Sequence, residues 1–187
     1  MEKAQKLLEK LLVSYRQAFD VTRPFESNGV FYDAYAAFRV TSAKYVFVKK
    51  AELWRANCFE HVFFSCRNTC TEEVVQSFRH EIATHLEPQF VRGGKNCTEK
   101  DHMYTYLTGI FLCENGVSKE VKKEIARFHF LKNYRFGIRG YSEGRLLVLD
   151  LKNQRILGNR AARELIRGYQ KQFEQKKPAK GKFKEER

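Results

Sequence analysis

The hydrophobic positions along the chain follow two different periods, and the first segment shows the helical one. Between residues 2 and 19, apolar side chains recur at steps of three and four with Lys and Glu between them. This spacing predicts an amphipathic helix that ends before Arg23-Pro24, because the residue before a proline avoids the helical region. Residues 30–41 alternate instead with a period of two, which predicts a strand with one apolar face and one solvated face.

The same two periods predict the rest of the elements. The helix in the middle of the chain begins in a capping-box spacing, with Thr69 followed three residues later by Glu72, and ends near Leu86 before Glu87-Pro88. Ser118 and Asn159 are placed to cap two later helices. The further strands are expected at 44–49, 59–66, 102–113, 128–139 and 145–151, and the further helices at 69–86, 119–127 and 159–173.

The segment 128–139 combines a strand pattern with positive charge. Its aromatic and aliphatic residues fall on one face, and His129, Asn133, Arg135 and Arg139 fall on the other. A five-residue loop at 140–144 then leads into the return strand.

The spacing of these elements predicts the fold class. The strands before the middle helix are joined too closely for parallel crossovers, so hairpins dominate and an α+β fold is expected. We expect one largely antiparallel, twisted sheet with helices packed on one face, including an N-terminal and a C-terminal helix. Residues 1–173 form a single domain in this interpretation, and the Lys-rich segment 174–187 is a basic disordered tail.

Composition narrows the class of protein. The chain has 187 residues, of which 43% are hydrophobic, enough to exclude a wholly disordered protein. Lys and Arg number 35 against 22 Asp and Glu, giving a formal net charge of +13, which suits either an anionic partner or simple solubility.

No window approaches the length of about 18 apolar residues that a membrane-spanning helix needs, and no secretory leader is expected. The odd number of cysteines, five, favours the reducing cytoplasm over a disulfide framework.

Motifs that would indicate metal or nucleophilic chemistry are incomplete. His80 and His85 lie five residues apart, whereas a zinc-binding helix needs two histidines four apart on one face. The cysteines lack two tight Cys-x2-Cys pairs, and there is neither a nucleophile elbow nor a phosphate-binding glycine loop. We therefore expect no metal and no cofactor. The cysteines are Cys58, Cys66, Cys70, Cys97 and Cys113.

An enzyme remains as an alternative. The order helix, three strands, helix, strand is also that of the restriction-endonuclease core, which suggests a metal-dependent, nuclease-like hydrolase. That chemistry needs a Glu or Asp two residues before a Lys, and Glu60-His61-Val62 lacks the Lys. Asp33 and Glu52 are the nearest other carboxylates. The acid–base candidates are Glu52, Glu60, His61 and His129.

The main hypothesis is a non-enzymatic binding module. If the polar faces of 30–41 and 128–139 line one hollow, arginines there can bind phosphates while tyrosines stack on bases. The partner would be nucleic acid or another polyanion, and not a membrane. A structural or interaction protein, including one that pairs with a second copy, is the third alternative. The expected ligand-binding residues are Arg39, His129, Asn133, Arg135 and Arg139.

Several short motifs spread over the chain carry a family resemblance. They are Lys49-Lys50-Ala51-Glu52-Leu53-Trp54, His102-Met103-Tyr104-Thr105-Tyr106, Asn133-Tyr134-Arg135-Phe136-Gly137-Ile138-Arg139-Gly140, Val148-x-Asp150-Leu151 and Asn159. Through them the chain resembles a family of uncharacterised small cytosolic bacterial proteins, chiefly from Gram-positive bacteria. The resemblance implies a bacterial, cytoplasmic origin and transfers no catalytic residue.

Overall fold

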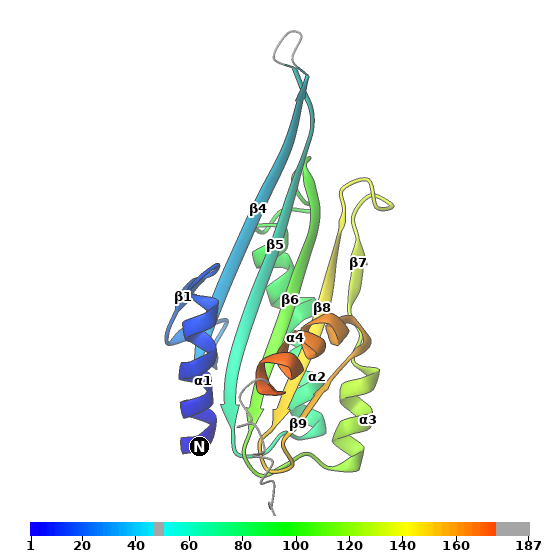
Figure 1. Ribbon diagram of the computed structural model, residues 1–187. Helices are drawn as coiled ribbons and strands as arrows, with labels where there is room; N and C mark the ends of the chain where they lie inside the picture. Colours follow the sequence, from blue (N-terminus) through cyan, green and yellow to red (C-terminus); the bar gives the residue numbers. More distant parts are fainter. Residues whose placement is uncertain (47–50, 175–187) are drawn as a thin grey trace, which may run out of the picture.

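The computed structural model describes the backbone of residues 1–46 and 51–174 and the side chains of 1–41 and 56–170. Within these residues, a seven-stranded sheet forms the centre and a two-stranded hairpin lies beside it (Figure 1). The strands are β1 (Asp20–Thr22), β2 (Phe25–Ser27), β3 (Val30–Tyr32), β4 (Ala34–Val46), β5 (Ala51–Arg67), β6 (His102–Cys113), β7 (Leu131–Asn133), β8 (Tyr141–Asp150) and β9 (Arg155–Gly158). The helices are α1 (Glu2–Tyr15), α2 (Glu72–Glu81), the π-helix η1 (Ile82–Val91), α3 (Lys119–Arg127), the 3₁₀-helix η2 (Arg160–Ala162) and α4 (Arg163–Glu174).

The sheet is mixed, and most of its strand pairs are antiparallel. Its order is β1-β4-β5-β6-β8-β7, with β9 also paired to β8. The pairs β5–β6 and β6–β8 are parallel, and the other four are antiparallel. The close spacing of the early strands does give hairpins, whereas the long α2–η1 and α3 connections supply the two crossovers that parallel pairs require. The expected α+β class, single domain and terminal helices are confirmed.

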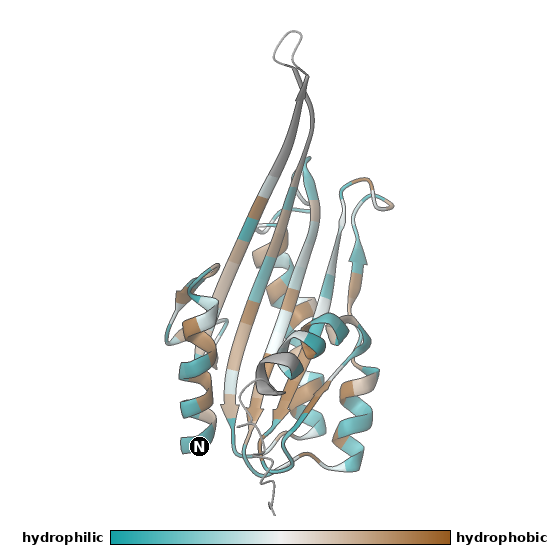
Figure 2. Ribbon diagram, in the orientation of Figure 1, coloured by the Kyte–Doolittle hydropathy of each residue, from teal (hydrophilic) through white to brown (hydrophobic). Residues whose placement is uncertain are grey.

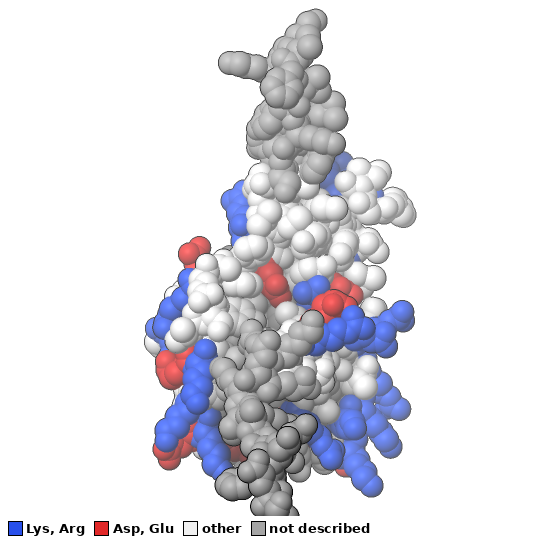
Figure 3. Space-filling model, in the orientation of Figure 1, with Lys and Arg blue, Asp and Glu red and all other residues white. Residues whose placement is uncertain are grey.

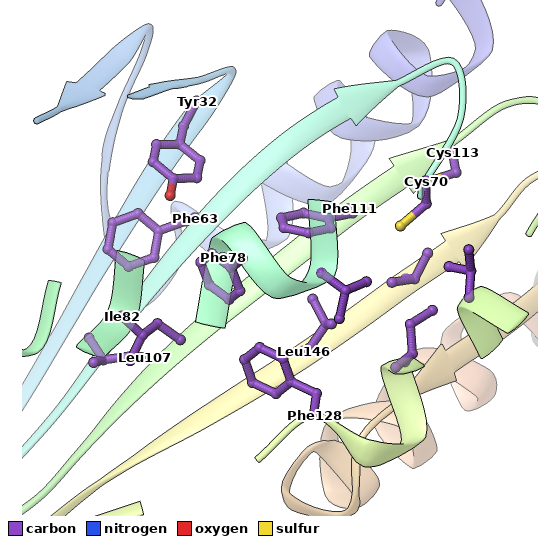
Figure 4. Packing of buried hydrophobic residues seen from close by; sticks show 14 of the residues in the cluster. Tyr32, Phe63, Cys70, Phe78, Ile82, Leu107, Phe111, Cys113, Phe128 and Leu146 are labelled. Carbon is purple, nitrogen blue, oxygen red and sulfur yellow. The ribbon is translucent and has the colours of Figure 1, made fainter. Parts of the chain in front are cut away.

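Helices cover both faces of the sheet, so the expectation of helices on one face is wrong. Along β5, Phe63 joins a core beneath α2, η1 and α3, whereas its neighbours Val62 and Phe64 join a core beneath α1 and α4. Successive side chains of a strand point to opposite faces, so the unbroken buried run from Ile110 to Cys113 in β6 needs cover on both sides. Figure 4 shows the first core, and Figure 2 shows that α1 has one hydrophobic side and one hydrophilic side.

The predicted strand 30–41 is divided at Asp33. Tyr32 in β3 and Ala34 in β4 belong to opposite cores, although the period of two placed both on one face. The Asp33 carboxylate explains the break, because it accepts hydrogen bonds from Gln5 Nε2 at 2.6 Å and from the Cys66 backbone N–H at 2.7 Å. The predicted strands 44–49 and 59–66 fall within the longer β4 and β5, apart from residues 47–50, which lie outside the described residues.

The predicted strand 128–139 is also shorter than expected. Only Leu131–Asn133 pairs as β7, and a turn follows before β8 begins at Tyr141, inside the segment expected to be a loop. The backbone angle φ is positive at Arg135, Phe136, Gly137 and Gly140. A side chain at Gly140 would place its Cβ 2.1 Å from the Met103 carbonyl oxygen, so only glycine fits there.

The middle helix starts later and runs further than its local signals predict. Thr71, rather than Thr69, caps α2 by accepting a hydrogen bond from the Val74 backbone N–H. The helix then continues through Pro88 as the π-helix η1, although the proline predicted an end near Leu86. Of the predicted tail 174–187, only Glu174 is described, at the end of α4, and residues 175–187 lie outside the described residues.

Candidate functional site

The strands β6 and β8 extend beyond α1 and α4 (Figure 1), and three tyrosines lie near the start of these two strands on one sheet face. Tyr104 and Tyr106 come from β6 and Tyr141 from the neighbouring strand β8, and all three are half-buried. Their ring centroids lie 4.7 Å apart for Tyr104 and Tyr106 and 6.0 Å apart for Tyr104 and Tyr141. These three residues together with Arg145 are called the tyrosine face below. Side chains two apart in a strand share a face, which is why β6 presents two of them.

An arginine lies flat against this face. The guanidinium carbon of Arg145 is 3.1 Å from the centroid of the Tyr106 ring, a cation–π contact. Its Nη1 is 3.7 Å from Glu60 Oε1, which also accepts a hydrogen bond from Thr108 Oγ1 at 2.8 Å. Burial raises the pKa of Glu60, while Thr108 and Arg145 act against that shift. The Arg145 Nε is buried and has no hydrogen-bond partner within the described residues.

The helices below the tyrosine face are joined by a tyrosine pair. The hydroxyl oxygens of Tyr15 in α1 and Tyr169 in α4 lie 3.0 Å apart. Burial raises the pKa of both phenols, so they remain neutral hydrogen-bonding groups. The two joined helices cover one part of this sheet face. The part near the start of β6 and β8, which carries the tyrosine face, lies beyond them.

Positive charge gathers on α3 and on the segment that leads from β8 into α4. Segments 119–127 and 152–167 together contain nine Lys or Arg residues and three Glu, a net charge of +6 from 25 residues. Figure 3 shows basic side chains over α3 and near the start of α4; α4 lies on the same sheet face as the tyrosines, whereas α3 packs on the core of the opposite face. This surface is called the basic rim: Lys119, Lys122, Lys123, Arg127, Lys152, Arg155, Arg160, Arg163 and Arg167, all exposed.

Comparison with known proteins places the chain in a family. A family model, Domain of unknown function (DUF8052), matches residues 3–171. The chain belongs to this family. Neither a search of curated proteins nor a search of solved structures gave a match. The DUF8052 match covers the sheet, both cores, the tyrosine face and the basic rim.

The five residues expected to bind an anion do not share one hollow in this DUF8052 domain. Arg39 lies on β4, with its guanidinium 5.3 Å above the Phe59 ring, and lines a cavity of about 310 Å³ on the face opposite the tyrosine face. Asn133 ends β7, and Arg135 and Arg139 lie in the turn after it. Because β5, β6 and β8 separate β4 from β7, these two strands are about 19 Å apart at about 4.8 Å per strand. His129 is exposed two residues after Arg127 of the basic rim.

The acid–base candidates that a hydrolase would use also lie apart from one another. Glu60 is paired with Arg145, while His61 packs on the opposite face against Phe90, with ring centroids 5.3 Å apart. The Glu52 side chain lies outside the described residues. Within the described part of the chain, no group of three or more His, Cys, Asp or Glu residues is arranged to hold a metal ion. The five cysteines are free thiols, and no described helix is long and apolar enough to cross a membrane.

The tyrosine face was not identified from the sequence, although part of its pattern is visible there. Tyr104 and Tyr106 alternate with Thr105 and Leu107, as expected of a strand with different faces. Tyr141 falls in the segment that was expected to be a loop, so its alignment with β6 could not be inferred. The parallel pairing of β6 with β8 is what brings these residues together.

Because His61 is buried, we expect the folded domain to lose stability in acid. Its Nδ1 lies 2.6 Å from the Tyr35 hydroxyl, and burial lowers its pKa from 6.5 to about 4. The unfolded chain therefore binds this proton more readily, so stability is full above pH 6.5 and falls by about 3 kcal/mol as the pH drops to 4. Urea denaturation at several pH values measures this slope. His61→Gln should flatten it, and equal slopes in the two proteins would rule out His61 as the cause.

Proposed function

We propose that this DUF8052 domain is a non-enzymatic module that binds single-stranded nucleic acid. Bases stack on the tyrosine face, and phosphates contact the arginines and lysines of the basic rim. The observation that supports this most directly is the set of three adjacent, half-exposed tyrosines on a part of the sheet that α1 and α4 leave uncovered. Aromatic side chains beside a positively charged surface are the usual means of holding unpaired strands without sequence preference.

A single strand fits this surface better than a duplex. Stacking on tyrosine requires bases that are not already paired and stacked on each other. The tyrosine rings come from two neighbouring strands and form a triangle, with centroids 4.7 Å apart for Tyr104 and Tyr106, 6.0 Å for Tyr104 and Tyr141, and 6.4 Å for Tyr106 and Tyr141. Arg145 adds a positive charge against these rings, because its guanidinium lies over the Tyr106 ring.

Fluorescence anisotropy with a labelled, mixed-sequence oligonucleotide tests the proposal. At about 50 mM salt we expect saturable binding, and Tyr106→Ala and Tyr141→Ala should each weaken it by about 5- to 150-fold, which corresponds to 1–3 kcal/mol per stacked base. Tyr106→Phe keeps the ring and should stay close to the wild type. Raising the salt to about 200 mM should weaken binding at least about tenfold, because phosphate contacts release counterions.

Charge-matched variants separate a specific surface from general attraction. Replacing Arg160, Arg163 and Arg167 by Gln should weaken binding strongly, whereas replacing Lys3, Lys6 and Lys10 of α1 by Gln removes the same charge elsewhere and should have little effect. No binding, equal effects of the two triple variants, or insensitivity to Tyr→Ala would contradict the proposal. The metal-dependent nuclease alternative predicts cleavage of the oligonucleotide when Mg²⁺ is added, which a denaturing gel detects.

We also propose a bacterial cytoplasm as the setting. All five cysteines are free, and Cys66, Cys70 and Cys113 are buried, as expected of thiols in a reducing compartment. The resemblance to bacterial cytosolic proteins supports the same setting.

A further inference from the structure

A second cavity lies on the opposite face of the sheet from the tyrosine face. It has a volume of about 660 Å³ and is bounded by the β2–β3 hairpin, α2 and the ends of β5 and β6. Its apolar wall comes from Val30, Val74, Phe78 and Phe111. Figure 4 shows Phe78 and Phe111 on this side of the sheet, together with Tyr32 of β3. The volume falls within the range of small-molecule sites.

Two side chains of opposite charge line this cavity. Glu81 Oε2 accepts a hydrogen bond from the Tyr32 hydroxyl at 2.6 Å, while the other carboxylate oxygen, Oε1, is buried without a partner among the described residues. Arg67 stacks its guanidinium 5.3 Å above the Phe111 ring, and its Nε is likewise buried without a partner there. The two residues form no direct ion pair with each other.

Buried polar atoms without a partner are unfavourable, and this holds most strongly for charged groups. An anion in the cavity would pair with Arg67 and leave the Glu81 carboxylate without a partner. A cation would pair with Glu81 and leave Arg67 without a partner. A ligand with both charges on one small framework satisfies both groups at once, and the apolar wall then contacts whatever side chain it carries.

We propose that this cavity binds a small zwitterion of the α-amino acid class. Its ammonium group pairs with the Glu81 carboxylate and its carboxylate with the Arg67 guanidinium, since both residues line the cavity, and an apolar side chain packs against Val74 and Phe78. This site lies on the other face of the sheet from the tyrosine face. The amino-acid proposal and the nucleic-acid proposal can therefore be tested independently of each other.

Thermal unfolding and isothermal titration calorimetry of the full chain with each of the twenty free amino acids test the proposal. At 10 mM ligand and pH 7, we expect at least one amino acid with an apolar side chain to raise the unfolding temperature by several degrees. The N-acetyl and the carboxamide derivatives of that amino acid each lack one charge and should bind at least about tenfold more weakly. These ligand-side controls use the wild-type protein, so they do not depend on how a variant folds.

Variants then assign the two contacts. Glu81→Gln and Arg67→Gln should each weaken binding at least about tenfold, whereas Glu120→Gln and Arg79→Gln change the same residue types away from the cavity and should not. Stabilisation by no amino acid would overturn the proposal. So would equal binding of the blocked derivatives, which would point to apolar contact alone, or equal affinity in the Glu81 and Arg67 variants.

Discussion

Glu87→Gln should lower the free energy of unfolding by about 3 kcal/mol, because removing one partner of a buried ion pair leaves the others uncompensated. The Glu87 side chain is only 1% exposed. Its carboxylate accepts hydrogen bonds from Arg92 Nε at 2.7 Å, Lys132 Nζ at 2.8 Å and the Tyr134 hydroxyl at 2.7 Å. These contacts join η1 to β7 and to the turn after it, so their loss affects two connections at once.

Urea denaturation at pH 7 measures this change. Glu120→Gln, which alters an exposed glutamate on α3, is the matched control and should stay within about 0.5 kcal/mol of the wild type. Burial alone would raise the pKa of Glu87, but the hydrogen bonds from Arg92, Lys132 and Tyr134 outweigh it and lower the pKa. Its stabilising effect is therefore present above the unfolded pKa, near 4.3, and is lost as the pH falls through the folded value. A variant as stable as the wild type would show that Arg92 and Lys132 find other partners.

Asn159→Ala should destabilise the domain by about 3 kcal/mol, because it leaves three buried backbone groups without partners at about 1 kcal/mol or more each. Its Oδ1 accepts from the Leu146 N–H at 3.0 Å, and its Nδ2 donates to the carbonyls of Phe128 at 3.1 Å and Gly144 at 3.0 Å. The side chain thus ties the start of η2 to β8 and to the end of α3.

Chemical denaturation of this variant should show a lower midpoint with an unchanged slope. Asn115→Ala, at an exposed asparagine, is the control and should change the free energy of unfolding by less than about 0.5 kcal/mol. An equal midpoint for Asn159→Ala would mean that the three backbone groups are satisfied in another way.

Local patterns predicted the elements whose signals are local. The periodicity of residues 2–19 gave α1, and Ser118 caps α3 as expected, accepting from the Val121 N–H at 3.2 Å. Asn159 does stand at the start of the last helical segment, but its side chain makes no capping hydrogen bond, because β8 and the end of α3 use it instead.

The predictions of secondary structure fail where contacts with residues far away in the sequence determine the local backbone. Pro88 predicts a helix end, yet the helix continues beside it, where Glu87 is anchored to Lys132 and Tyr134, more than forty residues away. The alternation of 128–139 resembles a strand, but Tyr134 is held by this same network and the chain turns after it. The tyrosine face depends on a parallel strand pair, and nothing in one segment of sequence shows which strand will lie beside it.

The contact between Tyr15 and Tyr169 spans 154 residues of the chain. During synthesis, α1 leaves the ribosome before α4, so Tyr15 gains this partner only after α4 has emerged. Until then the core face shared by Leu8, Ile110 and Leu147 lacks part of its cover. The nascent chain should therefore be open to proteases and in need of chaperones until α4 is complete, and a ribosome-bound chain ending at Gly158 should be cut readily within α1.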